Sequence, residues 1–171
     1  MTTPHFARRA HTVIGSPVGE LTLVATNGIL SGLYMEEQRH RPPQDDFGHR
    51  DVGPFAAAID QIQEYFSGGR TVFDVAIALG GTDFQQRVWT TLREIPHGQT
   101  ISYAELAVRV GTPSASRAVG LANGRNPIGI IVPCHRVVGS SGHLTGYGGG
   151  LNRKRFLLDF ESETASTVVP R

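Results

Sequence analysis

The chain has one cysteine, and its immediate neighbours could make it a nucleophile. Cys134 follows a short apolar segment, residues 129–132, and is itself followed at once by His135 and Arg136. The thiolate is the reactive form of cysteine, so an adjacent base that takes the proton and a positive charge directed inward would both activate it. A lone buried cysteine is normally only a small apolar side chain. The combination of Cys, His and Arg therefore indicates nucleophilic chemistry.

Three further features could complete a reaction centre around the cysteine. Asn126 precedes a proline in a rigid turn, where its side chain can bind nearby backbone groups. Glu161 follows a predicted helix and offers a carboxylate to orient the histidine, although a solvated acid at a helix end is the simpler interpretation. Residues 145–150 form a glycine-rich loop around Tyr147 that suits one wall of a pocket for a planar ligand. The loop lacks the Gly-Lys-Ser/Thr ending of a phosphate loop, and a plain solvent loop is the alternative.

The elements that must position these residues are helical in the second half of the chain. Apolar residues at helical spacing predict helices over 84–95, 103–110, 114–123 and 152–160. Thr82 or Asp83 is expected to cap the first, and Ser102 the second, with Glu105 completing a capping box. The second and third helices, joined by a glycine-bearing turn, make residues 102–123 a helix-turn-helix candidate.

The first half of the chain shows a different pattern, rich in strands. Alternating or short apolar runs predict strands over 12–14, 21–25, 30–35 and 72–79, and an amphipathic helix over 54–66. The polar residues 36–51 indicate a loop. A Gly-Gly pair at 80–81 marks the expected boundary between domains 1–81 and 82–171. The fold class is therefore α+β, with a small antiparallel-sheet domain followed by a mostly helical one.

Charge is distributed unevenly along the chain. Residues 1–81 hold six Arg and nine acids, a balance of −3, whereas residues 82–157 hold nine Lys and Arg against three acids, a balance of +6. This asymmetry is typical of a domain that binds a polyanion, although a solvated basic face would look the same. One cysteine excludes an intramolecular disulfide. With no apolar run long enough to span a membrane and no signal peptide in residues 1–12, a cytoplasmic protein is expected.

These motifs together resemble the O6-alkylguanine-DNA alkyltransferases, also called methylated-DNA–protein-cysteine methyltransferases. The specific signature is Ile-Val-Pro-Cys-His-Arg-Val at residues 131–137, in a resemblance that covers about residues 12–161. The accompanying motifs, in the family's order and spacing, lie at residues 82–89, 102–103, 117–120, 126–127 and 145–147. The resemblance implies a ribonuclease H-like N-terminal domain and irreversible, single-turnover transfer of the alkyl group from O6-alkylguanine in DNA to the protein's own cysteine. Activity on O4-alkylthymine is left open.

The resemblance also implies roles at the reaction centre. Cys134 corresponds to the alkyl acceptor, and His135 to the base that takes the thiol proton through a bound water. Glu161 corresponds to the carboxylate that orients the histidine. Asn126 corresponds to a hinge between the DNA-reading helix and the active-site segment. Tyr103 corresponds to the tyrosine that hydrogen-bonds the leaving guanine and crowds the target phosphate.

Further roles concern DNA and the base pocket. Arg117 corresponds to an arginine finger that fills the stack after the base has rotated out. Tyr147 and Gly148 correspond to the pocket wall, and the carbonyls of Cys134 and Val137 to acceptors for the guanine amino group. Small residues allow the helix to approach the sugar-phosphate backbone in the minor groove, where little sequence information is read. These small residues include Ser114, Ala118 and Gly120.

The sequence departs from the family pattern at two positions. Gly148 stands where many members carry Ser or Ala, which predicts a looser pocket wall with the backbone N–H donor retained. His97 stands where Tyr is common and is expected to be structural. Some relatives bind zinc in the N-terminal domain through cysteines, and because this chain has no second cysteine, neither a zinc site nor a cofactor is expected.

Three other functions were weighed against this one. A non-catalytic alkyltransferase-like lesion-binding protein would have replaced the acceptor, whereas Cys134 is intact. A helix-turn-helix transcription factor would carry base-reading side chains on residues 114–123, which are mostly small. A Cys–His hydrolase is disfavoured because adjacent residues in an extended segment point apart. The expected partner is double-stranded DNA carrying O6-alkylguanine, bound by a chain that is monomeric in solution, with clustering on DNA left open.

Overall fold

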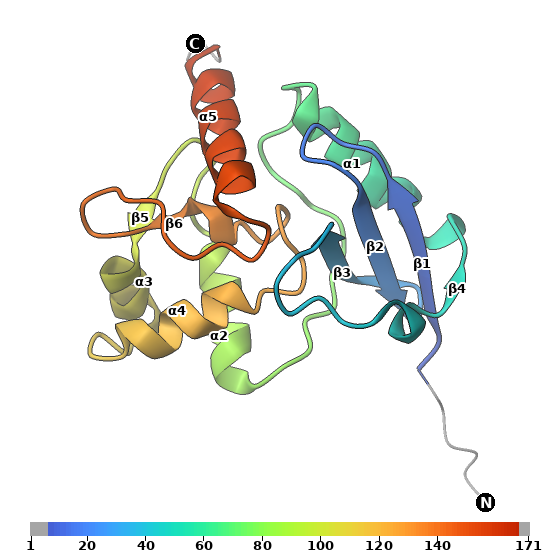
Figure 1. The fold of residues 1–171 in the computed structure, drawn as a ribbon, viewed down its shortest axis with the longest axis horizontal. Helices are drawn as coiled ribbons and strands as arrows, with labels where there is room; N and C mark the ends of the chain where they lie inside the picture. The colour runs from blue at the N-terminus through green and yellow to red at the C-terminus, as the bar shows by residue number, and fades with distance from the viewer. Residues whose placement is uncertain (1–6, 168–171) are drawn as a thin grey trace, which may run out of the picture.

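The computed structural model describes residues 7–167 and begins with a four-stranded sheet (Figure 1). The strand order is β3-β2-β1-β4, formed by Ile29–Met35, Leu21–Thr26, Arg9–Ile14 and His49–Arg50. The first three strands form the predicted antiparallel meander, and β4 pairs in parallel with β1. Asn27 and Gly28 both have positive φ, 50° and 81°, which is the backbone that a two-residue hairpin turn requires. Residues 1–6, part of the segment in which no signal peptide is expected, lie outside the described residues.

Two predictions for the first half are wrong in detail. Residues 72–79 are extended but form no named strand: one isolated bridge joins Ile77 to Leu30, and the backbone N–H of Asp74 donates to the Gln61 side chain. The alternation arises because one side of this segment packs on the core, and burial alone does not require a neighbouring strand. The predicted loop over 36–51 contains a 3-10 helix, Gln44–Phe47, as well as β4.

Helix α1, Ala56–Phe66, lies beside the sheet and follows a 3-10 turn at Gly53–Phe55 (Figure 1). It buries Ala58, Ile62 and Tyr65 in the core, whereas Ile59 and Phe66, which the predicted amphipathic spacing placed with Ile62, are only partly buried. Tyr65 belongs to this N-terminal layer, yet its hydroxyl group reaches the C-terminal half, as described below.

The second half is mostly helical, which confirms the expected α+β class. Its elements are α2 (Asp83–Leu92), β5 (Ile101–Ser102), α3 (Tyr103–Val110), α4 (Ser116–Gly124), η3 (Cys134–Arg136), β6 (Val137–Val138) and α5 (Leu151–Thr167). Thr82 caps α2 in a reciprocal capping box with Gln85. Ser102 caps α3 as predicted, but the Glu105 carboxylate accepts from Arg109 of the next turn and does not return to the cap. The capping box predicted there is therefore wrong.

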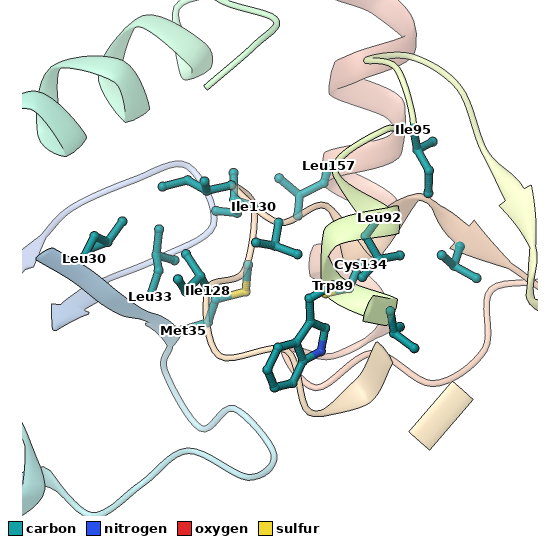
Figure 2. Packing of buried hydrophobic residues seen from close by; sticks show 14 of the residues in the cluster. Leu30, Leu33, Met35, Trp89, Leu92, Ile95, Ile128, Ile130, Cys134 and Leu157 are labelled. Carbon is teal, nitrogen blue, oxygen red and sulfur yellow. The ribbon is translucent and has the colours of Figure 1, made fainter. Parts of the chain in front are cut away.

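A continuous core joins the sheet to the helical half (Figure 2). Leu33 exchanges backbone hydrogen bonds with the segment after α4, donating to Pro127 at 2.9 Å and accepting from Gly129 at 3.2 Å. Trp89 of α2 and Cys134 belong to the same cluster, and the Trp89 indole N–H donates to the Ala122 carbonyl of α4 at 2.8 Å. The segment between α4 and Cys134 is thus packed between the two halves. Within residues 7–167 no helix is long and apolar enough to cross a membrane.

Candidate active site

The backbone before Cys134 is wound into a tight, buried turn. Ile130 adopts the left-handed conformation at φ 70°, which is uncommon for a β-branched residue and is held here by its surroundings. The Asn126 side chain fastens this turn from inside, donating to the Val132 carbonyl at 2.7 Å and accepting from the Ile128 N–H at 3.0 Å. Asn126 therefore links the end of α4 to the backbone that presents the cysteine.

Cys134 is 6% exposed and begins the short helix η3. Burial raises the pKa of its thiol, while hydrogen bonding to Asn126 and the positive charge of Lys154 act in the opposite direction. The cysteine lines a narrow pocket together with Asn126, Tyr147 and Gly148. The structure thus brings four of the sequence-predicted residues to one small space.

His135 and Glu161 form a buried pair beside the cysteine. Nε2 of His135 lies 2.7 Å from Oε1 of Glu161, and the two side chains are 0% and 1% exposed. Because a carboxylate only accepts hydrogen bonds, Nε2 carries the proton and Nδ1 keeps its lone pair. Nδ1 is buried and has no hydrogen-bond partner among the described residues. Burial lowers the pKa of His135 despite the opposing carboxylate, so the imidazole is neutral and able to accept a proton.

Arg136 does not act on the thiol as the sequence suggested. Its Nε and Nη2 donate to the two oxygens of Glu161 at 2.8 and 2.9 Å, and its Nη1 donates to the Ile95 carbonyl at 2.6 Å. A guanidinium fits a carboxylate through two parallel hydrogen bonds, which makes Glu161 the favoured partner. The donors on Glu161 hold the pKa of that carboxyl well below its usual range, against the effect of burial.

Glu161 is not a solvated acid at a helix end. It is 1% exposed, and α5 continues six residues beyond it. The carboxylate also accepts from the Tyr65 hydroxyl of α1 at 2.8 Å. Sequence analysis did not identify Tyr65, although its place on the buried face of a predicted helix was visible.

Lys154 is a second residue that the sequence analysis missed. It is fully buried, and Nζ donates to the carbonyls of Val137 at 2.6 Å and Thr145 at 3.0 Å. Desolvation lowers the pKa of Lys154 to about 8. The signal was present in the helical spacing: Lys154, Leu157 and Glu161 recur at i, i+3 and i+7, which places them on one face of α5.

The glycine-rich loop closes one side of the pocket against the N-terminal half. The Arg39 N–H donates to the Gly148 carbonyl at 2.8 Å, and the Tyr147 hydroxyl group lies 3.9 Å from the Met35 sulfur. A Cβ at Gly148 would lie 3.5 Å from its nearest neighbours, an ordinary contact, so the missing side chain leaves room at this wall. A Cβ at Gly149 would lie 2.5 Å from the Met35 sulfur, so a larger residue there would require the Met35 side chain to shift.

A groove runs from this pocket along α4. Tyr103 and Gly120 line it, and a Cβ at Gly120 would lie 3.7 Å from the Tyr103 ring. The Tyr103 hydroxyl donates to the Thr145 carbonyl at 3.0 Å. Arg39 and His40, from the N-terminal half, also line the groove and were not predicted.

The remaining residues predicted to contact DNA lie in or just before α4. Arg117 and Ala118 are exposed in its first turn. Ser114 is exposed too, but it lies in the turn before the helix, because α4 begins at Ser116 and not at residue 114 as predicted. Within residues 7–167 no group of three or more His, Cys, Asp or Glu side chains could hold a metal ion.

Two family models match the chain, one for each half. Residues 83–163 match the family model described as 6-O-methylguanine DNA methyltransferase, DNA binding domain, and residues 10–79 match the ribonuclease-like domain of the same family. The chain belongs to the 6-O-methylguanine DNA methyltransferase family. The resemblance drawn from the cysteine motif and the expected fold class are thereby confirmed.

Relatives are similar over nearly the whole chain. The methylated-DNA–protein-cysteine methyltransferase of Mycobacterium tuberculosis H37Rv is 55% identical over 155 residues, covering 91% of this chain and 93% of the relative. The protein of that name from Methanosarcina acetivorans is 44% identical over 88% of this chain and 97% of its own. The crystal structure of M. tuberculosis OGT in complex with DNA superposes with a TM-score of 0.87 at 54% identity, covering 91% and 94% of the two chains. These matches support DNA as the partner of this chain and do not favour the non-catalytic alternative.

Proposed function

We propose that this chain repairs DNA by moving the alkyl group of O6-alkylguanine irreversibly onto Cys134. The observation that carries the proposal is the placement of this buried thiol. It lies in a narrow pocket bordered by Asn126 and Tyr147, directly before the His135–Glu161 pair. The names of the relatives and the complex of M. tuberculosis OGT with DNA support the same reaction.

The first step is removal of the thiol proton. His135 is the base, and one bound water carries the proton from Sγ to the free Nδ1, since adjacent residues cannot easily hydrogen-bond directly. Glu161 stabilises the imidazolium that forms, through the existing 2.7 Å contact with Nε2. The positive charge of Lys154 also lowers the pKa of the thiol.

The second step is an in-line displacement at the alkyl carbon. The Cys134 sulfur forms a bond to that carbon while the carbon–O6 bond breaks, and its electron pair stays on the guanine. Tyr103 turns its hydroxyl from the Thr145 carbonyl, now 3.0 Å away, toward the base and supplies the hydrogen bond or proton that the guanine anion needs. The thioether has no facile reverse reaction, so each molecule acts once.

The base reaches the cysteine only after it leaves the duplex. Unstacking costs a few kcal/mol, and less for a weakened pair. Arg117 on α4 fills the gap in the stack, and the small residues of that helix let it lie close to the backbone in the minor groove. Three of these small residues are Ser114, Ala118 and Gly120.

In the pocket, Tyr147 and Gly148 form the wall against the flipped guanine. The carbonyls of Cys134 and Val137 accept from its amino group. The Cys134 carbonyl already accepts from the Val137 N–H and, through a long contact of 3.4 Å that the amino group would replace, from Asn123. The Val137 carbonyl accepts from Lys154 at 2.6 Å. We further propose a division at residue 81, a chain monomeric in solution, and a cytoplasmic location.

The test measures the conversion of O6-methylguanine to guanine in DNA. A duplex oligonucleotide with one O6-methylguanine is incubated with increasing protein and then digested, and its nucleosides are separated. The proposal expects O6-methylguanine to be replaced by guanine, mole for mole with added protein. Tight binding with the lesion left intact would instead indicate the non-catalytic lesion-binding protein.

A further inference from the structure

One hydrogen bond crosses from the N-terminal half directly into the proton-accepting pair. Tyr65 of α1 donates its hydroxyl proton to Oε1 of Glu161 at 2.8 Å, although the two residues are 96 positions apart. Both side chains are buried, at 0% and 1% exposure. Ring contacts with Phe66, Phe73, His97 and Phe160, at centroid distances of 4.9 to 5.9 Å, fix the position of the phenol.

Tyr65 and His135 share one oxygen atom of the carboxylate. Oε1 of Glu161 accepts from Tyr65, from His135 Nε2 at 2.7 Å and from Arg136 Nη2 at 2.9 Å, while Oε2 accepts from Arg136 Nε. Each donor partly neutralises the negative charge of the carboxylate, and in a buried site water does not screen that effect. The phenol therefore acts on the oxygen that faces the histidine.

We propose that Tyr65 is a positioning residue of the alkyl transfer, whose hydroxyl group orients Glu161 and limits the negative charge that Glu161 presents to His135. The inference rests on the proposed function. The His135 imidazole then stays neutral in the resting protein, with Nδ1 free to take the Cys134 proton. The ring also keeps its orientation, with Nε2 toward Glu161. The N-terminal half would thus contribute to the reaction as well as to the core.

The proposed role depends on the Tyr65 hydroxyl group and not on the packing of its ring. A phenylalanine would keep the ring contacts without burying a polar group. Burying a hydroxyl group is costly unless it is hydrogen-bonded, and here its hydrogen bond is to Glu161. The other titratable or charged groups around the pair are His97 after α2, Cys134 and Arg136 of η3, Tyr147 of the glycine-rich loop, and Lys154 of α5. All of them remain in a Tyr65 variant.

The direction of the pH effect follows from the shared oxygen. Without the phenol donor, Oε1 carries more negative charge, which favours the protonated imidazole and raises the pKa of His135. A larger fraction of the base is then already protonated at mildly acidic pH. The acid limb of the rate profile should move to higher pH, and the looser carboxylate should lower the plateau rate.

The test compares Tyr65→Phe with Tyr34→Phe, a buried tyrosine of the same half that stacks on Phe47 away from Glu161. Alkylation by free O6-benzylguanine is followed by protein mass between pH 5.5 and 8.5, and DNA affinity is measured separately. Tyr65→Phe should react about tenfold more slowly, with its acid limb shifted upward by about half a pH unit and with unchanged DNA affinity. Tyr34→Phe should match wild type. A Tyr65→Phe profile that superposes on wild type would overturn the inference.

A second measurement covers the case in which Tyr65→Phe fails to fold. Site-specific 3-fluorotyrosine at position 65 keeps the shape and makes the phenol a stronger donor, so the acid limb should move to lower pH. No shift, or the opposite shift, would overturn the inference. Wild type that does not react at all would overturn the proposed function and this inference with it, whereas reactive wild type with unaltered variants would overturn only the role of Tyr65.

Discussion

Lys154 Nζ lies 2.6 Å from the carbonyl oxygen of Val137, in a position from which it also reaches the carbonyl of Thr145. One buried ammonium group thereby joins the strand that follows the cysteine to the start of the glycine-rich loop. Its positive charge also lowers the pKa of the Cys134 thiol, against the larger effect of burial. We therefore expect the position of these two segments and the pKa of the Cys134 thiol to depend on the same side chain.

Replacing this lysine should slow the reaction with every substrate. Lys154→Met keeps the length of the side chain, loses both hydrogen bonds and raises the pKa of the thiol. Because neither loss involves DNA, the rate constants for lesion-bearing duplex and for free O6-benzylguanine should fall by similar factors, about tenfold or more. Arg155→Met, at the neighbouring exposed position, is the control. Normal rates for Lys154→Met would show that the ammonium group is only structural.

Arg117 should affect only the reaction with duplex DNA. Arg117→Ala removes the side chain that replaces the flipped base, and side-chain stacking on a base contributes about 1–3 kcal/mol, or roughly five- to 150-fold in rate. Reaction with free O6-benzylguanine should be unchanged. Arg70→Ala, an exchange at an arginine paired with Glu64, should alter neither rate. Equal losses on both substrates would argue against the finger role.

The stability of the protein should decline as the pH falls below neutrality. Burial holds the pKa of His135 below its ordinary value, so the unfolded chain binds a proton that the folded chain rejects. The associated stability is complete above about pH 6.5 and is lost below it, at up to about 1.4 kcal/mol per pH unit for one proton. Urea unfolding at pH 7.5 and 5.5 should show the loss. His135→Gln should reduce it, and His49→Gln, at an exposed site, should not. A pH-independent wild type would contradict the buried neutral imidazole.

The link between α2 and α4 should be visible in stability. Trp89→Phe leaves the Ala122 carbonyl without its indole donor and removes part of a buried ring, which should cost about 1–3 kcal/mol. Val108→Ala, on the exposed side of α3, should change stability by less than about 0.5 kcal/mol. Urea unfolding must be followed by circular dichroism, since Trp89 is the only tryptophan. An unchanged midpoint for Trp89→Phe would show that the indole hydrogen bond contributes nothing.

Local signals in the sequence predicted those parts of the structure that depend on local physics. Thr82 and Ser102 begin helices because a side-chain oxygen before an apolar periodic run caps the first turn. The Cys-His pair was also found from its residue types, whereas the orienting role of Glu161 came from the family resemblance, because a solvated acid at a helix end was the simpler interpretation of its position. Residues 72–79 were assigned wrongly as a strand, because alternation reports which side is buried and not whether a neighbouring strand is present.

The contacts that the sequence did not predict depend on where side chains point in the folded protein, which the sequence alone does not show. Arg136 lies two residues after Cys134, yet its guanidinium group contacts Glu161, since a buried carboxylate has the stronger need for a donor. Lys154 was hidden among surface-like charges at the start of a helix, and only its i+7 relation to Glu161 indicated the buried face. Tyr65 could be placed in the core, but its contact across the two halves follows from tertiary packing alone.

The central claim is that Cys134 itself accepts one alkyl group, and the mass of the intact protein tests it directly. Wild type and Cys134→Ala are each incubated with excess duplex carrying one O6-methylguanine. The account predicts that wild type gains the mass of one methyl group, that the group maps to Cys134, and that no second group follows. The variant should gain nothing while still binding DNA. Methylation of the variant, or methylation of wild type at another residue, would contradict the account.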